Sequence, residues 1–588
     1  LQVAPEAMLC SVAQELGGGA VSAGLMLLPP YEEPLPSEAI WRFGIDLGST
    51  NTTVFVKKGK RLEEVIFHAS FMQAFADVSE AGTLELWTDF MSVDDQKMPF
   101  LTLLMDRNVA SGQQLPLLTS HIIFSKNHLS QALHSLCVSP DSGKARFNLK
   151  WDTSREARQD VKTFLSQVMM QCLAEAARDG VSPRNVRWSF AYPEAFQNEQ
   201  LQHFRAAQER ALVFAAQGKA TKELIEPGLT ESLATALCFH VSHPAVFHET
   251  AITFDVGGET TDVTIWQNKT LVWRCSLRIG GRNLFLRYLT EYPVFLDQLA
   301  PHDPVLAQAI GFRDGGCKKK NLSSAEFHEV IINSAAYERA FNEHHWTIAE
   351  EPYSRVLRDA LTFALGGLLY YVGKATAALA VHGRFDMYRD TVTLCFGGRG
   401  SLAFSKFVNP AFNEHLQELF NEGAGQKFHH HALIYSDEPK KEVAMGLLSD
   451  FGDLNNTKPA RPLVPLGEEI LVGLGHYPKD AASDIADLDP DQPWRVSQLA
   501  QLREYHQRYC SHLLEPSPFE QQHERDLLML VNNALEEDRK GARDAIRTSD
   551  LMIAQPPFIL ALRERVHQIV KLRLGRSRSL QQEGGILP

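Results

Sequence analysis

Two segments of this chain share one plan, and that repeat constrains the fold more than any other feature. Each has an apolar run, a turn with aspartate, glycine and hydroxyl residues, and a second apolar run: "FGIDLGSTNTTVFV" at 43–56 and "AITFDVGGETTDVTIWQ" at 251–267. Apolar runs joined by a short glycine-containing turn are typical of β-hairpins. The repeat therefore predicts two related halves, each opening with a hairpin.

The tip of the first predicted hairpin has the chemistry of an anion site. Gly48 leaves the backbone open to close approach, and successive amides in such a turn can converge on an anion. Ser49, Thr50 and Asn51 add hydroxyl and amide donors. Asp46 would repel a phosphate unless a cation lay between them, and Mg²⁺ is the usual one.

The second turn repeats this chemistry. If the two turns faced each other, they would clamp a di- or triphosphate, with Mg²⁺ held through water between Asp46 and Asp255. One such turn alone is more often a plain hairpin, but two of them, each between strands, favour the clamp. The second set of predicted phosphate ligands is Gly257, Gly258, Glu259, Thr260 and Thr261.

A third element follows the second turn. "LCFGGRGS" at 394–401 predicts a buried strand that ends in a glycine-rich turn. Gly397 and Gly398 would allow close contact with a purine or ribose, and Arg399 could stack on the base.

These three elements, in this order, resemble the actin/Hsp70/sugar-kinase superfamily of ATPases, and the Hsp70-like branch fits best. "GIDLGSTNTTVFV", "FDVGGETTDVTI" and "CFGGRGSLAF" resemble its two phosphate motifs and its adenosine motif. "IEPGLTESLATAL" resembles a connecting helix and puts Glu231 at the position of a catalytic-site glutamate. "VRWSFAYPEAFQNEQLQHFRAA", "RIGGRNLFLRYL" and "EPKKEVAMGLL" resemble further segments of the same unit, so the likeness covers about 43 to 450.

The resemblance implies an α/β fold of two ribonuclease-H-like lobes with a nucleotide cleft between them, plus a mostly helical C-terminal region. No peptide-binding β-sandwich of the Hsp70 type is recognisable after 450. The expected division is an N-terminal arm at 1–40, lobe I at 41–246, lobe II at 247–450 and the C-terminal region at 451–588.

The implied function is a slow Mg²⁺-dependent ATPase that binds ATP and ADP and acts as a conformational switch for a protein partner. Asp46, Glu231 and Asp255 would be its catalytic residues. Two departures from the family pattern bear on hydrolysis. Glu259 stands where the family has a third glycine, and it either points outward or disfavours the γ-phosphate. The family's lysine near that phosphate has only a weak counterpart in Lys126.

Three alternatives remain open at this stage. The chain could be a scaffold that holds nucleotide without hydrolysing it, or an actin-like protein that forms filaments. A sugar or acyl kinase is a third, although we find no substrate signature. Assembly through the C-terminal region is also open.

Composition narrows the class of protein and its partners. The 588 residues carry a formal net charge of −13, which does not favour nucleic acid as a partner. Eight cysteines without a CxxC pair predict reduced thiols, and the N-terminal residues lack a basic signal-peptide region, so we expect a cytoplasmic protein. The apolar stretch 361–381 is predicted to be a core helix and not a transmembrane segment, because it contains Lys374 and a Gly-Gly pair.

Overall fold

The fold is described from a computed structural model of the chain. The structure describes residues 7–12, 21–27, 39–67, 97–107, 120–122, 142–150, 155–282, 294–315, 324–343, 352–408 and 412–454, with a few gaps of one or two residues inside these ranges. It also describes parts of 501–509 and 558–571 and the single residues 133, 284 and 288.

The first half of the chain forms a mixed sheet around its predicted hairpin. Strands β3 and β4 are the antiparallel arms of that hairpin, and β10 pairs in parallel with β3. The strand order is β5-β4-β3-β10-β11, with β6 also paired to β4. The strands are β3 (Trp41–Leu47), β4 (Asn51–Lys58), β5 (Arg61–Glu64), β6 (Phe100–Leu101), β10 (Val186–Tyr192) and β11 (Leu229–Thr230).

Two long helices cover one face of this sheet. Helix α4 (Arg155–Arg178) packs beside α5 (Asn198–Ala215), and apolar residues of both form one core cluster with β3 and β10. Phe43 of β3 stacks on Trp188 of β10 with ring centroids 5.1 Å apart inside this cluster. The segment "VRWSFAYPEAFQNEQLQHFRAA", quoted above for its resemblance, thus contains β10 and the first part of α5.

The second half forms a second mixed sheet of the same design. Strands β12 and β13 are the antiparallel arms of the second hairpin, and β15 pairs in parallel with β12. The strand order is β14-β13-β12-β15-β16, with β17 also paired to β15. The strands are β12 (Thr250–Val256), β13 (Thr261–Gln267), β14 (Thr270–Leu277), β15 (Thr391–Gly397), β16 (His429–His430) and β17 (Ile434–Tyr435).

Along its five-strand path, without the extra strands β6 and β17, each sheet has the same order: third, second, first, fourth, fifth. In both, the first two strands form the hairpin, and the fourth strand pairs in parallel with the first. The prediction of an α/β protein is confirmed, and its two mixed sheets have similar topologies.

A largely buried helix, α12 (Pro352–Val381), organises the core of the second half. Segment Val356–Val381 is long and apolar enough to pass for a membrane span, but 72% of its most apolar window is buried inside the protein. Gly366 and Gly367 let neighbouring side chains approach the helix backbone closely. A Cβ on Gly367 would lie 2.5 Å from Leu562, and one on Gly366 would lie 2.9 Å from the Tyr505 hydroxyl. The prediction of a core helix is confirmed.

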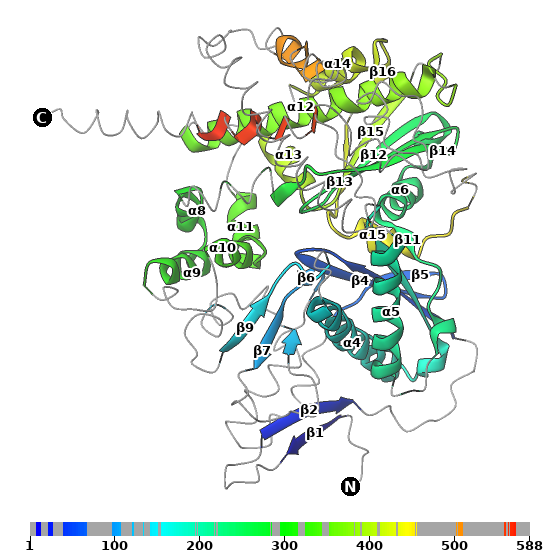
Figure 1. The fold of residues 1–588 in the computed structure, drawn as a ribbon, viewed down its shortest axis with the longest axis vertical. Coiled ribbons are helices and arrows are strands. Elements are labelled where there is room, and N and C mark those ends of the chain that lie inside the picture. Colours follow the sequence, from blue (N-terminus) through cyan, green and yellow to red (C-terminus); the bar gives the residue numbers. More distant parts are fainter. Residues whose placement is uncertain are drawn as a thin grey trace, which may run out of the picture.

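Other helices of the second half lie beside α12 or form a group to one side of the two sheets (Figure 1). Helix α14 packs along α12, and α8 to α11 form a separate group level with the space between the sheets. The helices are α8 (Val294–Leu299), α9 (Pro304–Gly315), α10 (Ser324–Ile332), α11 (Ala335–Glu343), α13 (Ser401–Phe407) and α14 (Asn413–Ala424). Short 3-10 helices lie at Pro183–Asn185, Lys222–Leu224, Pro244–His248 and Ala300–His302.

The ends of the chain are described only in part. Within the predicted N-terminal arm, strands β1 (Ala7–Val12) and β2 (Val21–Leu27) form an antiparallel pair. A small sheet of order β8-β7-β9 comprises β7 (Leu104–Arg107), β8 (Ser120–Ile122) and β9 (Ser142–Arg146). Most of the predicted region 451–588 lies outside the described residues, but helical parts of 501–509 and 558–571 contribute buried residues to the α12 core.

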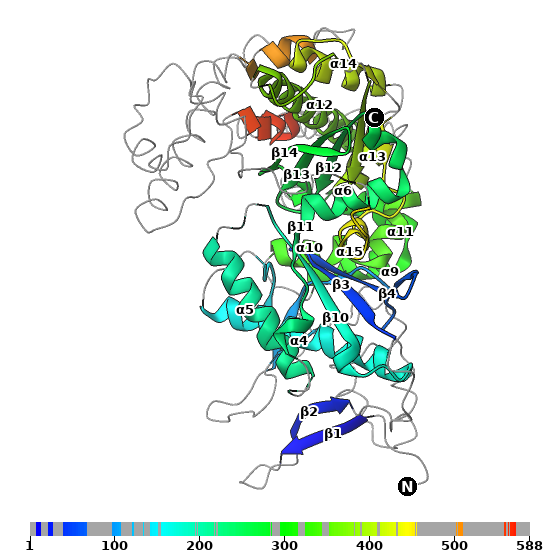
Figure 2. The same ribbon diagram turned by 90° about the vertical axis from the view of Figure 1, so that its right-hand side faces the viewer.

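Two short helices cross between the sheets (Figures 1 and 2). Helix α6 (Glu231–Ser242) belongs to the first half by sequence but packs on β12 and β13 of the second sheet. Helix α15 (Glu442–Leu447) comes from the end of the second half but packs on β3, β4 and β10. A Cβ on Gly446 would lie 1.8 Å from the Ala234 carbonyl, so only glycine permits this crossing.

Replacing Gly446 with alanine tests the importance of this crossing. The added methyl would overlap the α6 backbone, and separating the helices should lower stability by about 1–3 kcal/mol. The matched control is Gly311→Ala in α9, where a Cβ meets nothing within 4 Å and alanine should be neutral or slightly favourable. Equal urea midpoints for the two variants would show that the close contact between α6 and α15 does not contribute to stability in this way.

Candidate functional site

The tips of the two hairpins face each other. Each tip is closed by a backbone hydrogen bond, from Gly48 N to Asn51 O at 3.1 Å and from Gly257 N to Thr260 O at 2.8 Å. A Cβ on Gly258 would lie 3.0 Å from the Ser49 hydroxyl, so side chains larger than glycine would close the gap between the tips. The repeat seen in the sequence thus becomes two opposed polar turns.

The glycine-rich turn after β15 packs against the second tip. Gly400 N donates to the Val256 carbonyl at 2.8 Å. Gly398 has φ +76°, and a Cβ there would lie 2.3 Å from Asp255 Oδ1, so this position needs glycine on two counts. Its amide donates to Glu442 Oε1 at 3.1 Å, which ties the turn to the start of α15.

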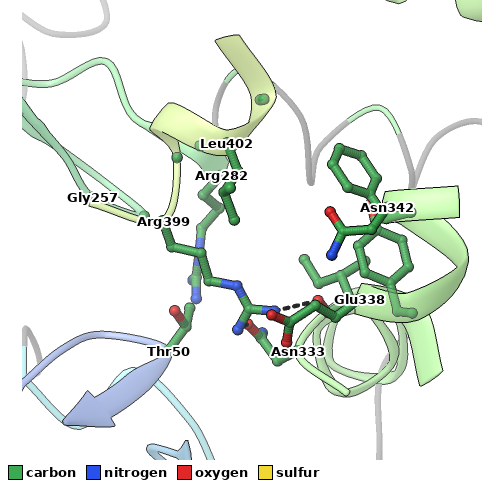
Figure 3. A pocket seen from close by; sticks show the side chains of 15 residues that line it. Thr50, Gly257, Arg282, Asn333, Glu338, Asn342, Arg399 and Leu402 are labelled. Carbon is green, nitrogen blue, oxygen red and sulfur yellow. Dashed lines mark hydrogen bonds between the residues drawn. The ribbon is translucent and has the colours of Figure 1, made fainter. Parts of the chain in front are cut away.

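These turns border one pocket with a volume of about 120 Å³ (Figure 3). Its polar residues come from the turns and from the α10–α11 region, and its apolar wall comes from α11 and α13. The polar residues include Thr50, Arg282, Asn333, Glu338, Asn342 and Arg399, and the apolar ones Ile332, Tyr337, Phe341, Leu402 and Ala403.

Arg399 spans the cleft at the edge of this pocket. Its guanidinium donates to Asn51 Oδ1 and Asn333 Oδ1, both at 3.1 Å, and to the Ile332 carbonyl at 3.2 Å. Asn51 Nδ2 in turn donates to Asn333 Oδ1 at 2.7 Å and to Thr50 Oγ1 at 3.1 Å. The side-chain amide of Asn51, which was predicted to face phosphate, is therefore engaged across the cleft.

Glu259, the departure noted in the second turn, is paired with a cation. Its carboxylate lies 3.1 Å from Arg282, which also forms an ion pair with the buried Glu329. Arg282 N donates to the Gly258 carbonyl at 2.7 Å, so this cation is fixed to the second turn. The negative charge of Glu259 is thus compensated next to the pocket.

A cluster of buried carboxylates lies behind the two tips. Asp46 and Asp255 end the first strands of their hairpins, and Glu231 begins α6. The Lys440 ammonium donates to Asp46 Oδ2, and the Lys150 ammonium donates to Glu231 Oε1. Thr235, one turn along α6, donates to Asp255 Oδ2 at 3.0 Å.

Burial and crowding alter the acidity of this cluster. Burial raises the pKa of Asp255 to about 8, with Glu442, Glu231 and Asp46 adding to the rise and Lys440 opposing it. Burial also raises the pKa of Glu231, although Lys150 opposes it. Burial alone would lower the pKa of Lys440, but Asp46, Glu231 and Asp255 together raise it, so its ammonium stays charged.

The residues between the two turns do not fit a divalent cation as they stand. Mg²⁺ requires a near-octahedral shell of oxygen ligands at about 2.0–2.1 Å. The ammonium of Lys440 instead lies on Asp46 and against the first turn, since a Cβ on Gly48 would be 2.6 Å from its Nζ. Asp46 Oδ1 has no hydrogen-bond partner among the described residues, but the ammonium on Oδ2 puts a positive charge where a water-bound cation was predicted. No group of three or more His, Cys, Asp or Glu side chains suited to a metal occurs in the described part of the chain.

The structure brings most of the predicted site residues together. The residues of both turns and of the Gly397–Arg399 segment lie around the pocket and the carboxylate cluster. Thr261 is an exception, because its hydroxyl donates to the Ile279 carbonyl and is used within lobe II. Lys126 lies outside the described residues.

Sequence reasoning missed four residues at this site. Lys440 sits in "EPKK" before α15, and Lys150 precedes α4. Arg282 directly follows Gly280 and Gly281 in the segment "RIGGRNLFLRYL" quoted above. That segment could therefore have indicated Arg282 as a site residue. Asn333 lies just after α10 and carries no motif.

Comparison with known proteins adds no family assignment: no protein-family model matches the chain, and no curated protein matches it either.

Glu329 provides a pH test of the Arg282 network. Burial raises its pKa to about 7 despite Arg282, with Glu259 adding to the rise, so the folded protein favours the protonated form. That stabilisation is complete below the unfolded pKa of about 4.3 and is lost as pH rises through about 7. Glu329→Gln, which cannot ionise, should therefore gain stability relative to the unmodified protein between these pH values and show a constant difference above them.

Urea midpoints across this pH range measure the effect. The matched control is Glu414→Gln in α14, which makes the same exchange at an exposed position outside the Arg282 network. A difference for Glu329→Gln that stays constant with pH would show that Glu329 does not titrate in this way.

Proposed function

We propose that the chain is an ATP- and ADP-binding protein of the actin/Hsp70-like type, with nucleotide in the cleft between two ribonuclease-H-like lobes. The observation that carries the proposal is the convergence of two opposed polar turns and a glycine-rich turn on one pocket. The shared strand order of the two sheets supports the assignment of the lobes. No family match contributes to it, so the proposal rests on geometry and on the motifs.

The parts of the pocket correspond to the parts of a nucleotide. The phosphates would lie between the tips, where Ser49 and Thr50 of the first turn face Gly258 of the second. The base would lie against the apolar wall of α11 and α13 and stack on Arg399, which lines the same pocket. Thr50 and Gly258, which line the same pocket from opposite lobes, would meet the phosphate end.

Binding would act on both lobes at once. Asn51 and Asn333 already connect lobe I to lobe II, so a ligand that displaces or strengthens this contact would change how the lobes close. This is a hinge-type switch. We propose that it is used to control a protein partner, and that the protein acts in the cytoplasm.

Hydrolysis would be slow. Glu231 is the residue proposed to orient the attacking water, but its carboxylate is held by Lys150. The same ion pair favours a second candidate function, a nucleotide-binding scaffold that does not hydrolyse ATP. In either case catalysis would come from positioning and from fixed charges.

Filling the apolar wall tests nucleotide binding. Ala403→Trp places an indole in the pocket and should weaken ADP and ATP binding about tenfold or more. Val381→Trp adds the same side chain at a position that is 85% exposed, at the end of α12, and should bind as the unmodified protein does. Equal nucleotide affinities for the two variants, measured by calorimetry, would place the nucleotide outside this pocket.

Phosphate release separates the ATPase from the scaffold. Under the slow-ATPase proposal, Glu231→Gln should lower the rate of release about a hundredfold, while ATP affinity changes little. Retained ATP affinity also shows that the variant is folded. Unchanged turnover in Glu231→Gln would remove Glu231 from the mechanism, and no release from the unmodified protein would favour the scaffold.

A further inference from the structure

We propose that Lys440 takes the place of the divalent cation, so that this chain binds nucleotide without Mg²⁺. The inference rests on the proposed function and adds to it the form of the ligand, a metal-free nucleoside di- or triphosphate. It starts from the disagreement between the predicted Mg²⁺ site and the ammonium found there.

The ammonium lies where the sequence predicted the metal. It donates to Asp46 Oδ2 and lies against the Gly48 backbone at the base of the first turn. It also interacts electrostatically with Glu231 and Asp255. A single cation thus lies on Asp46, one of the two aspartates that Mg²⁺ was expected to bridge.

The backbone of Lys440 adopts an unfavourable conformation where its ammonium is placed on Asp46. Its φ of +85° lies in the left-handed region, which costs a residue with a Cβ about 1–2 kcal/mol. The Lys440 carbonyl accepts from the Thr53 hydroxyl of β4 at 3.0 Å, and the neighbouring Lys441 pairs with Glu64 of β5 at 2.8 Å. Both contacts fix the segment before α15 to lobe I. Residues held in strained backbone conformations occur mainly at active sites and ligand-binding sites, which supports a functional role for Lys440.

The charge on Lys440 suits a phosphate ligand. The Asp46 side chain is 1% exposed and that of Lys440 is 17% exposed, so water screens the two charges only weakly. Lysine is a common phosphate ligand because its ammonium is a compact point charge with three donors. With Asp46 neutralised by Lys440, a phosphate can approach the first turn without a metal between them.

The test compares ADP binding in excess EDTA with ADP binding in excess Mg²⁺, by calorimetry on the full chain. For the unmodified protein, the two dissociation constants should agree within about threefold. In Lys440→Met, metal-free affinity should fall about tenfold or more, and Mg²⁺ should restore it by pairing with the vacated Asp46.

Two further variants separate loss of the cation from loss of the fold. Lys440→Met/Asp46→Asn leaves no unpaired buried charge, and it should bind weakly with and without Mg²⁺. Lys57→Met removes a lysine that pairs with the exposed Asp450 at 3.1 Å, and its binding should be unchanged.

Two results overturn the inference. If the unmodified protein binds ADP only with Mg²⁺, or if Lys440→Met keeps its metal-free affinity, then Lys440 is not the substitute, and nucleotide binding itself stands. If ADP does not bind under either condition, the proposed function fails and the role of Lys440 fails with it.

Discussion

The crossing of α6 and α15 is the contact on which the rest of the site depends. It requires Gly446 to lie against the Ala234 backbone, and each helix packs on the sheet contributed mainly by the other half of the chain. Because α6 begins at Glu231 and α15 begins two residues after Lys440, the crossing carries both residues to the carboxylate cluster. Moving either helix outward would separate the charges behind the two tips.

The crossing also accounts for the arrangement of the polar turns. Glu442, the first residue of α15, holds the Gly398 amide, and Thr235 of α6 holds Asp255. The glycine-rich turn and the second hairpin are therefore fixed to the same pair of helices. Buried carboxylates are costly unless paired, and here Lys150 and Lys440 supply that pairing from elements distant in sequence.

Much of the architecture could be predicted from the sequence because it is encoded locally. Alternating apolar runs around Gly48 and Gly257 specify hairpins, and the period of α4 specifies a long buried helix. The partners in the cleft could not be predicted, because ion pairs such as Lys440–Asp46 join residues almost 400 positions apart (|i−j| = 394) and leave no local pattern. The swap of α6 and α15 between sheets was missed for the same reason, since packing decides it and not periodicity.

The central claim is that nucleotide binds between the two hairpin tips. Hydrogen–deuterium exchange with and without saturating ADP tests it directly, because backbone amides that bind phosphate exchange slowly. The account predicts simultaneous protection at 48–51, 257–261 and 397–400. Protection confined to one of these segments, or to none of them, would contradict it.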